Sequence, residues 1–343
     1  MAKVTLGALT VERQPNESVL DCLQSAGAKI PSGCRTGSCQ SCMLRLVDGV
    51  TPPEAQRGLK DTLRTRGFFL ACQARPTVDI VVTTEANAAD SYTAQVLSSQ
   101  LLSADVLQLR LVPTRPFPYF PGQFLNLVQQ LNGELLIRSY SIASIPNQDT
   151  YLELHLRLVP QGRMTTFAQT LKVGDTVQLR GPSGDCFYVA GRPDQPLLLI
   201  GTGTGLAPLY GILREALRSG HQGPITLLHG AQNPSGLYLV SELSALAQQH
   251  ANLTYVPCVL QSSTLFTSAA PIAAWSATVP LVEGSLSQQL AARFPKLAGF
   301  RVFLCGAPAL VQALRRQIFL AGASSREIFA DAFAMAPPPG TSA

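Results

Sequence analysis

Four cysteines carry the most specific chemistry in this chain of 343 residues. Cys34, Cys39 and Cys42 stand close together, and Cys72 follows after 29 further residues. Three thiolates from one tight loop and a fourth from a distant segment can converge on two iron ions and two bridging sulfides. The spacing C-x4-C-x2-C…C therefore predicts a [2Fe-2S] cluster with these four residues as its metal ligands.

A zinc site and a disulfide framework are the alternatives. Zinc sites usually take their ligands from two pairs of closely spaced Cys or His residues, whereas here a single distant cysteine accompanies a cluster of three. Disulfide-built proteins are typically short and secreted, but this chain is long, has eight cysteines and shows no signal-peptide pattern. We expect reduced thiols and a cytoplasmic protein. Cys22, Cys186 and Cys258 lie in apolar segments, which indicates core packing.

Charge and hydropathy exclude several classes of partner. The net charge of +5 is modest and no run of Lys or Arg forms a basic patch, so we expect no nucleic acid and no membrane surface as a partner. The longest uncharged apolar stretch, residues 195–213, is broken by glycines and prolines, which argues against a membrane span. The length favours two or three domains.

Residues 1–88 predict a small β-rich domain around the cysteines. We expect a helix from Ser18 and strands at 3–9, 12–14, 43–47 and 79–84. This segment resembles the β-grasp fold of plant-type ferredoxins. The resemblance has one departure, because Gln40 stands between the second and third ligands where a small residue is usual.

Two further domains follow, so that the predicted fold class is multidomain α+β and α/β. In residues 89–190, alternating strands at 92–97, 106–111, 123–128, 152–158 and 176–180 predict an antiparallel β-barrel. Residues 191–335 alternate between apolar strands and helices, which is typical of a doubly wound parallel sheet. The expected strands are 197–200, 226–229, 253–259 and 302–305, and the expected helices are 209–218, 241–250, 285–294 and 309–321. Residues 336–343 are predicted to be a disordered tail.

The second domain contains the tetrapeptide Arg138-Ser139-Tyr140-Ser141. A guanidinium can clamp a pyrophosphate, a tyrosine ring can stack on a flavin, and a hydroxyl can approach flavin N5. With the P-G-Q-F and G-x-x-T stretches that flank it, this segment resembles the flavin barrel of the ferredoxin reductase superfamily. The resemblance implies FAD, bound by Arg138, Ser139, Tyr140, Ser141, His155, Leu156, Arg157, Gly162, Arg163, Met164 and Thr165. The side chains of residues 155–157 are equally compatible with a solvent-facing position.

The third domain has two turns that fit a nicotinamide nucleotide. The strand at 197–200 leads into G-x-G-x-G, and the strand at 302–305 leads into C-G-A-P. In the reductase superfamily the first turn lies against the ribose and pyrophosphate, and the cysteine of the second lies beside nicotinamide C4. The resemblance implies contacts from Gly201, Thr202, Gly203, Thr204, Gly205, Pro208, Cys305, Gly306, Ala307 and Pro308. It also places Phe333 beside the flavin and gives Asp331 a supporting position next to it. Phe333 also fits a core position. Ser141, Cys305 and Phe333 form the expected catalytic set.

The choice of coenzyme follows from a lack of cations. Recognition of the NADPH 2′-phosphate needs Lys or Arg, and residues 219–292 contain neither. We therefore expect NADH as the donor, with Gly230, Ala231 and Gln232 near its ribose. Related reductases often carry arginine at the position of Gln232.

The order of the three domains resembles the NADH-dependent reductase components of bacterial aromatic-ring dioxygenases and multicomponent monooxygenases, of the naphthalene dioxygenase reductase type. The resemblance implies an oxidoreductase that takes hydride from NADH onto FAD. Single electrons would then pass through the [2Fe-2S] cluster to an oxygenase or a separate ferredoxin. We expect a monomer in isolation. A reductase for a radical dehydratase in deoxysugar biosynthesis would carry the same modules, and a redox-sensing binding module is a second alternative.

Overall fold

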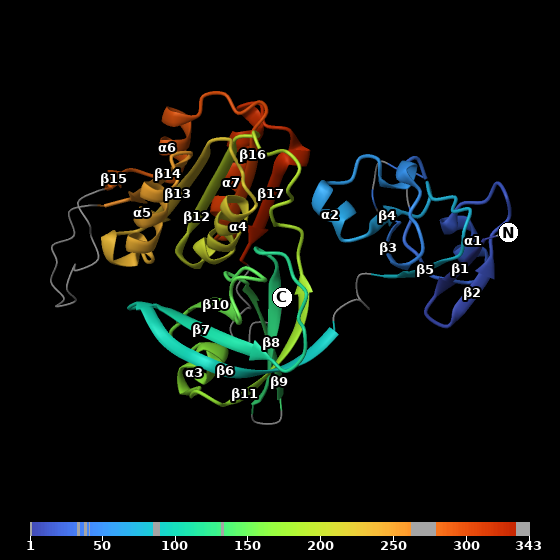
Figure 1. The fold of residues 1–343 in the computed structure, drawn as a ribbon, viewed down its shortest axis with the longest axis horizontal. Helices are drawn as coiled ribbons and strands as arrows, with labels where there is room; N and C mark the ends of the chain where they lie inside the picture. The colour runs from blue at the N-terminus through green and yellow to red at the C-terminus, as the bar shows by residue number, and fades with distance from the viewer. Residues whose placement is uncertain are drawn as a thin grey trace. The chain divides into compact units, whose positions relative to one another are not determined.

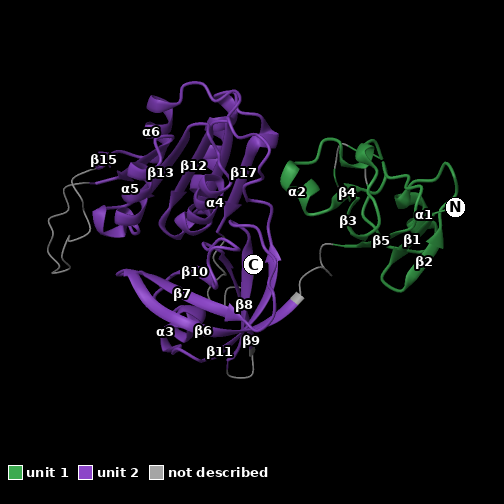
Figure 2. Ribbon diagram, viewed as in Figure 1, with its two compact units in different colours: residues 1–90 green, residues 91–343 purple. Residues whose placement is uncertain are grey.

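The computed structural model describes residues 2–32, 35–37, 40, 42–84, 90–131, 134–261 and 279–333. The chain divides into two compact units, residues 1–90 and residues 91–343 (Figure 2). Cys34, Cys39 and the predicted tail at 336–343 lie outside the described residues.

Unit 1 is built on a five-stranded sheet in the order β2-β1-β5-β3-β4 (Figure 1). Its strands are β1 (Lys3–Leu6), β2 (Leu9–Glu12), β3 (Met43–Asp48), β4 (Phe68–Leu70) and β5 (Ile80–Thr83), with helix α1 at Val19–Ser25 and a short helix α2 at Asp61–Thr65. The mixed sheet, with β1 parallel to β5, confirms the ferredoxin-like fold. The strand expected at 12–14 begins three residues earlier, at Leu9, because β1 ends at Leu6 and the turn that contains Gly7, with φ +59°, follows it directly.

Helix α1 begins where the sequence predicts it. Ser18 is the N-cap, and its hydroxyl accepts a hydrogen bond of 3.2 Å from the Asp21 amide. The buried face of the helix includes Leu20, Cys22 and Leu23, which pack on the sheet. Cys22 is therefore a core residue, as expected.

The first half of unit 2 is an antiparallel sheet in the order β10-β7-β6-β11-β8-β9. Its strands are β6 (Asp90–Ser103), β7 (Val106–Pro113), β8 (Phe124–Leu131), β9 (Glu134–Ser141), β10 (Leu152–Arg157) and β11 (Thr176–Ser183), and helix α3 spans Arg163–Thr170. A bridge between Ile142 and Leu154 brings its two edges together, which gives the barrel. The sequence did not predict β9, the strand that carries the R-S-Y-S tetrapeptide.

The second half of unit 2 is a parallel sheet in the order β15-β14-β13-β12-β16-β17. Its strands are β12 (Leu197–Thr202), β13 (Ile225–Ala231), β14 (Leu253–Val259), β15 (Val282–Glu283), β16 (Arg301–Gly306) and β17 (Ile328–Ala332). Its helices are α4 (Leu206–Arg218), α5 (Val240–Gln249), α6 (Leu286–Arg293) and α7 (Pro308–Leu320). Helices α4 and α5 pack on one face and α6 and α7 on the other, which confirms the doubly wound α/β domain. No helix in the described part of the chain is long and apolar enough to cross a bilayer.

The strand order reverses between β12 and β16, and this position locates the binding edge. Strands β13 and β14 follow β12 on one side, whereas β16 and β17 lie on the other. In open α/β sheets, ligands bind outside the carboxyl ends of the strands at such a switch point. Both glycine-containing turns of the sequence leave the sheet there.

Helix α4 joins the barrel to the α/β domain through close glycine contacts. A Cβ atom on Gly211 would lie 3.2 Å from the carbonyl oxygens of Ile142 and Ala143. On the barrel side, a Cβ atom on Gly122 would lie 2.5 Å from the Cys186 oxygen and 2.7 Å from Ile212. The absence of side chains at both glycines lets the helix lie directly against the end of β9.

Candidate functional site

The described part of the predicted cluster site consists of two buried thiols. Cys42 precedes β3 and Cys72 follows β4, and the Ala71 amide donates a 3.1 Å hydrogen bond to the Cys42 carbonyl. Both are free thiols. Burial is the main cause that raises the pKa of Cys42 to about 11, and the hydrogen bond with the Cys72 side chain adds to the shift. A thiol like that of Cys42 stays protonated unless a metal replaces the proton, and two buried thiols from separate segments fit the ligand set of an iron–sulfur cluster.

The loop between the cysteine ligands contains residues with left-handed backbone conformations. Gly37 has φ +84°, and Gln40 has φ +61°. A side chain in the left-handed region costs roughly 1 kcal/mol. Every residue with a Cβ atom bears this cost at position 40, so the backbone conformation there does not by itself favour a small side chain over Gln40. Nearby, the Gln73 side chain donates to the Arg35 carbonyl at 2.9 Å and to the Cys72 sulfur at 3.5 Å.

The predicted flavin residues lie on β9, where successive side chains alternate in direction. Arg138 and Tyr140 are half-buried, whereas Ser139 is exposed and donates to Asn126 at 2.7 Å. Burial raises the pKa of Tyr140 to about 12, and the positive charge of Arg138 opposes that shift. Within the described residues no carboxylate pairs with Arg138, whose guanidinium donates to the Ile137 carbonyl. This unneutralised guanidinium fits the pyrophosphate of FAD.

Ser141 meets the α/β domain at the end of β9. Its hydroxyl donates a hydrogen bond of 3.4 Å to the carboxylate of Asp331 on β17. Burial raises the pKa of Asp331 to about 6; the bond from Ser141 opposes the shift, and the charge of Asp185 adds to it. Two residues that the sequence assigned to one site are thus in contact across the two domains.

Cys305 lies beside this pair. It is opposite Asp331 in the β16–β17 register, and its sulfur lies 3.8 Å from the sulfur of Cys186. Burial, with the Cys186 thiol adding to it, raises the pKa of Cys305 well above its ordinary value. The thiol therefore stays protonated at neutral pH. The Phe333 amide donates to the Gly306 carbonyl at 2.8 Å, which holds the half-buried Phe333 next to the same turn.

The two predicted nucleotide turns are in contact with each other. A Cβ atom on Gly205 would lie 2.3 Å from the Cys305 carbonyl oxygen, and one on Gly306 would lie 2.9 Å from the Thr202 hydroxyl. Gly201 pairs with Cys305 in the β12–β16 register. Gly203 has φ +52°, and a Cβ atom there would meet no atom within 4 Å. The turn therefore has an open face that fits a nucleotide.

Other predicted residues have mixed environments. Thr204 is half-buried, and Pro208 is buried in the first turn of α4. Ala307 and Pro308 are exposed where α7 begins. At the end of β13, Gly230 packs on Leu286 and Ala231 is half-buried, and Gln232, the first residue after the strand, is exposed.

The start of helix α3 presents backbone rather than side chains. Gly162 is its N-cap, and the Thr165 hydroxyl donates to the Gly162 carbonyl at 3.0 Å. Met164 is part of the barrel core, and Arg163 is half-buried. Amide groups at a helix start suit a phosphate.

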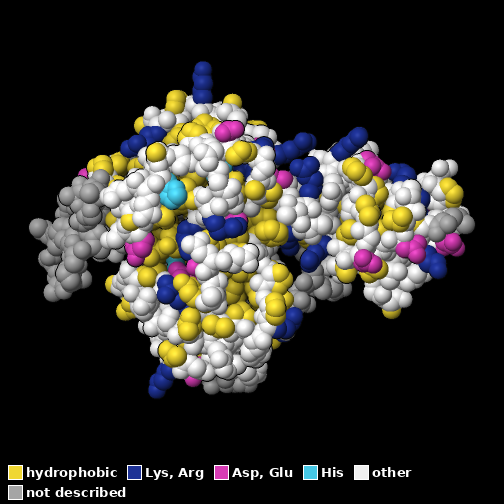
Figure 3. Space-filling model, viewed as in Figure 1, with side chains coloured by type: hydrophobic (Ala, Val, Ile, Leu, Met, Phe, Trp, Pro, Cys, Tyr) yellow, Lys and Arg dark blue, Asp and Glu magenta, His cyan; other side chains and the backbone are white. Residues whose placement is uncertain are grey.

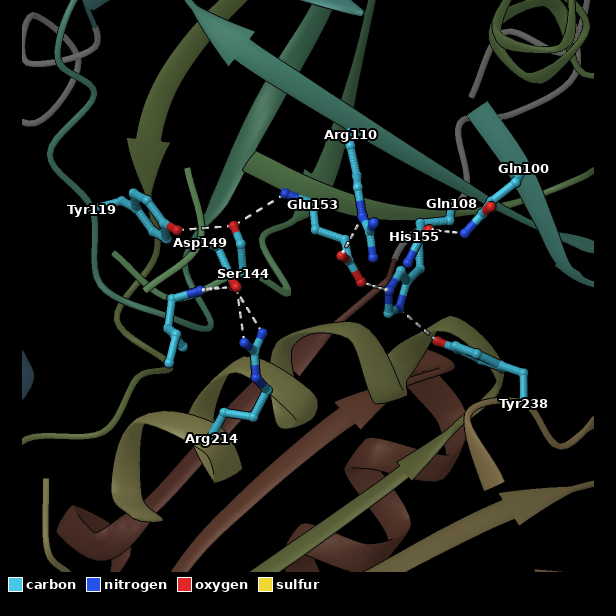
Figure 4. A network of polar contacts seen from close by, with 11 residues as sticks. Gln100, Gln108, Arg110, Tyr119, Ser144, Asp149, Glu153, His155, Arg214 and Tyr238 are labelled. Carbon is cyan, nitrogen blue, oxygen red and sulfur yellow. Dashed lines mark hydrogen bonds and ion pairs between the residues drawn. The ribbon is translucent and has the colours of Figure 1, made fainter. Parts of the chain in front are cut away.

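The three predicted residues on β10 differ from one another. Leu156 is in the barrel core, Arg157 is exposed, and His155 is buried. The His155 ring contacts Glu153 at 2.9 Å through Nε2 and the Tyr238 hydroxyl at 3.1 Å through Nδ1 (Figure 4). Its side chain is thus committed to protein contacts, which leaves the backbone of this strand for a cofactor.

Most of the polar network at this boundary was not predicted from the sequence. Figure 4 shows Arg110, Glu153 and Tyr238 with His155, and Asp149 with Arg214. Alternation along residues 152–157 does place Glu153 and His155 on the outer face of the barrel. Their burial depends on the α/β domain packing over that face, which no local pattern shows.

Charged side chains do not form a single patch on the face of the molecule that Figure 3 draws. Figure 3 shows Lys and Arg spread over both units, with acidic side chains among them. This spread agrees with the modest net charge of +5.

Comparisons with known families match the three parts of the chain. Residues 4–77 match the 2Fe-2S iron-sulfur cluster binding domain, residues 93–188 the oxidoreductase FAD-binding domain, and residues 199–316 the oxidoreductase NAD-binding domain. The described cysteines, β9 and the two glycine turns lie within these three matches.

Individual proteins are similar over nearly the whole chain. The reductase component of the naphthalene 1,2-dioxygenase system of Pseudomonas putida is 32% identical, over 92% of this chain and 93% of its own length. Reductase component 1 of terephthalate 1,2-dioxygenase from Comamonas sp is 33% identical, over 94% of both chains. Among solved structures, an Amycolatopsis cytochrome P450 reductase is 29% identical with a TM-score of 0.63, over 97% of this chain and 99% of that one. The ferredoxin reductase in carbazole 1,9a-dioxygenase is 25% identical with a TM-score of 0.62, over 97% and 98% of the two chains.

The domain matches and the full-length similarity agree with the cofactors that the sequence predicts: FAD, a [2Fe-2S] cluster and a nicotinamide nucleotide. This chain belongs to the family of FAD- and [2Fe-2S]-containing, NAD(P)H-dependent oxidoreductases that form the reductase components of dioxygenases and monooxygenases.

Proposed function

We propose that this protein oxidises NADH and delivers electrons one at a time to the oxygenase component of a ring-oxidising system, or to a separate ferredoxin. The observation that carries the proposal is the meeting of Ser141, Asp331 and Cys305 beside the open glycine turn. FAD and the cluster, when bound, supply the conversion from a two-electron donor to a one-electron acceptor. The protein's own residues bind, orient and shield these groups.

The flavin site rests on β9 and on the start of α3. Arg138 neutralises the pyrophosphate, and the amide groups of residues 162–165 take up the remaining phosphate charge. Tyr140 offers a half-buried ring as a stacking face. Ser141 closes the site next to Asp331, where its hydroxyl is held in a fixed direction by the 3.4 Å bond.

The nicotinamide site rests on the turns after β12 and β16. Residues 201–205 give an open surface for the pyrophosphate and ribose, and Cys305 lies directly behind it. Because burial keeps the thiol protonated, Cys305 acts through packing and not as a base. The backbone of Phe333 is held next to Gly306 by its 2.8 Å hydrogen bond, which places this residue at the carboxyl edge of the sheet.

The preference for NADH follows from the loop after β13. Gln232 is exposed there, and the sequence has no Lys or Arg from residue 219 to residue 292. A 2′-phosphate would find no nearby cation from this segment, whereas a ribose hydroxyl needs none.

The acceptor class follows from the relatives. Their names assign them to dioxygenase and monooxygenase systems, which favours an oxygenase partner over a radical dehydratase. We propose a cytoplasmic monomer that meets its acceptor through unit 1, which holds the cluster cysteines.

An anaerobic titration with NADH tests the proposal. The purified protein should show flavin and [2Fe-2S] absorbance, and NADH should bleach both. With cytochrome c as the electron acceptor, turnover should require NADH and the intact cluster. A protein whose flavin is not bleached by NADH is not a reductase of this kind.

A further inference from the structure

A chain of four buried or half-buried polar side chains runs from the barrel into the α/β domain (Figure 4). Arg110 on β7 donates to Glu153 on β10 at 3.0 Å, and Glu153 contacts His155 Nε2 at 2.9 Å. His155 Nδ1 then meets the hydroxyl of Tyr238 at 3.1 Å. We call these residues the interdomain chain.

One arrangement of protons satisfies the contacts of Glu153, His155 and Tyr238 with one another. Burial alone would raise the pKa of Glu153, but the hydrogen bond from His155 and the charge and hydrogen bond of Arg110 lower it to about 2. An ionised carboxylate only accepts hydrogen bonds, so His155 Nε2 carries a proton. Burial raises the pKa of Tyr238 far above its ordinary value, so its hydroxyl remains a donor and binds the free lone pair of Nδ1.

The middle of this chain and its Tyr238 end lie next to the proposed nucleotide site. Strand β10, which carries Glu153 and His155, contacts the glycine turn at 203–205. Tyr238 closely follows the segment at 230–232, the end of β13 and the start of the next loop, which is the proposed ribose-binding segment. The next residue, Leu239, has φ +55°, an unfavourable conformation for a bulky side chain. The position of this loop thus depends on contacts that hold the strained turn.

We propose that Tyr238 is a positioning residue for hydride transfer. Its hydroxyl, through His155, fixes the nucleotide loop relative to the barrel strand that lies under the glycine turn. The inference rests on the proposed function, because it concerns the approach of the nicotinamide to the flavin. Small displacements of reacting groups slow a reaction strongly even when binding is little changed.

The domains have other connections that should survive the loss of this bond. Arg214 on α4 makes a paired contact with Asp149 of the barrel, at 2.7 and 2.9 Å. Gly211 and Gly122 also keep α4 against the barrel. Tyr238→Phe should therefore loosen one contact without separating the domains.

The chain offers a matched control in Tyr255. Its hydroxyl bonds to His229 Nδ1 at 3.1 Å, the same length as the Tyr238–His155 bond, and both tyrosines are buried. Tyr255 and His229 lie on the neighbouring strands β14 and β13 of one domain. Tyr255→Phe thus removes an equivalent buried bond that does not cross the domain boundary.

The experiment measures flavin bleaching by stopped flow under anaerobic NADH, with the limiting rate and the apparent Kd fitted separately. We expect Tyr238→Phe to retain FAD, to keep its Kd within about threefold and to lower the limiting rate about tenfold. Tyr255→Phe should keep the wild-type limiting rate. If Tyr238 acts through His155, the double variant with His155→Gln should be no slower than His155→Gln alone.

Two results would overturn the inference: a Tyr238→Phe limiting rate within twofold of wild type, or an equal loss in Tyr255→Phe. Additive losses in the double variant would also reject the route through His155. Failure of the proposed function is distinguishable, because in that case NADH would not bleach the wild-type flavin at all.

Discussion

Ser141 on β9 donates a 3.4 Å hydrogen bond to Asp331 on β17, although the two residues are 190 positions apart. The bond joins the barrel to the last strand of the α/β domain, beside Cys305. A buried carboxylate with only a long hydrogen bond to it holds its charge less readily than one in water. Burial therefore raises the pKa of Asp331 toward neutral pH, and the single hydrogen bond from Ser141 only partly opposes that shift.

Asp331→Asn tests that titration. Burial raises the folded-state pKa of Asp331 from 3.8 to about 6. Between these values the folded protein binds more protons than the unfolded one, so the contribution of Asp331 to stability is present below pH 4 and is lost as pH rises to 6. The difference in melting temperature, Asp331→Asn minus wild type, should thus become more positive as the pH is raised from 4 to 7. A difference that does not change with pH would show that Asp331 has an ordinary pKa.

Cys72→Ser tests the cluster. Removing one of four thiolate ligands should abolish the [2Fe-2S] absorbance and electron paramagnetic resonance signal and stop cytochrome c reduction. Reduction of ferricyanide by NADH through FAD should survive, because that route does not need the cluster. Cys22→Ala, which changes a buried core cysteine of the same unit, should keep the cluster. Stoichiometric zinc in the wild-type protein would contradict the assignment.

Arg138→Ala tests the flavin clamp. The variant should purify with depleted FAD, since the pyrophosphate loses its guanidinium partner, and should recover activity when FAD is added. The flavin-to-protein absorbance ratio measures the loss. Arg115 is an exposed arginine of the barrel that stacks over Tyr92 at 3.9 Å, so Arg115→Ala is the control and should retain FAD. Full FAD content in both variants would place the pyrophosphate elsewhere.

The coenzyme preference can be measured by steady-state kinetics. We expect kcat/KM for NADH to exceed that for NADPH by at least about tenfold, which corresponds to roughly 1.4 kcal/mol of transition-state binding. Gln232 is exposed, so Gln232→Arg can supply a cation without disturbing the core. This variant should have a higher kcat/KM for NADPH and therefore a smaller ratio of the NADH value to the NADPH value. Equal kcat/KM values for NADH and NADPH in the wild type would contradict the inference drawn from the lack of Lys and Arg in residues 219–292.

The sequence predicts the parts of this protein better than it predicts their contacts. Apolar strands such as 197–200 and glycine turns are local features, and the structure confirms them. Strand β9 was not predicted because its sequence, ELLIRSYS, places three apolar residues in a row before mostly polar ones and so lacks the period of two that marks a strand. The contacts of Ser141 with Asp331 and of His155 with Tyr238 depend on how two domains dock, and no local period carries that information.

Cys305→Ala separates flavin binding from hydride transfer. The variant should retain FAD, because Cys305 lies on β16 and does not belong to β9 or α3. It should slow flavin bleaching by NADH, since a cavity beside the glycine turn lets the nicotinamide adopt unproductive positions. Cys258→Ala is the matched control, because Cys258 is an equally buried thiol on β14 of the same sheet. If both variants bleach at the wild-type rate, Cys305 is only a core residue. If both slow equally, the effect comes from general loosening of the sheet, and the contact of Cys305 with Gly205 has no special part in placing the nicotinamide.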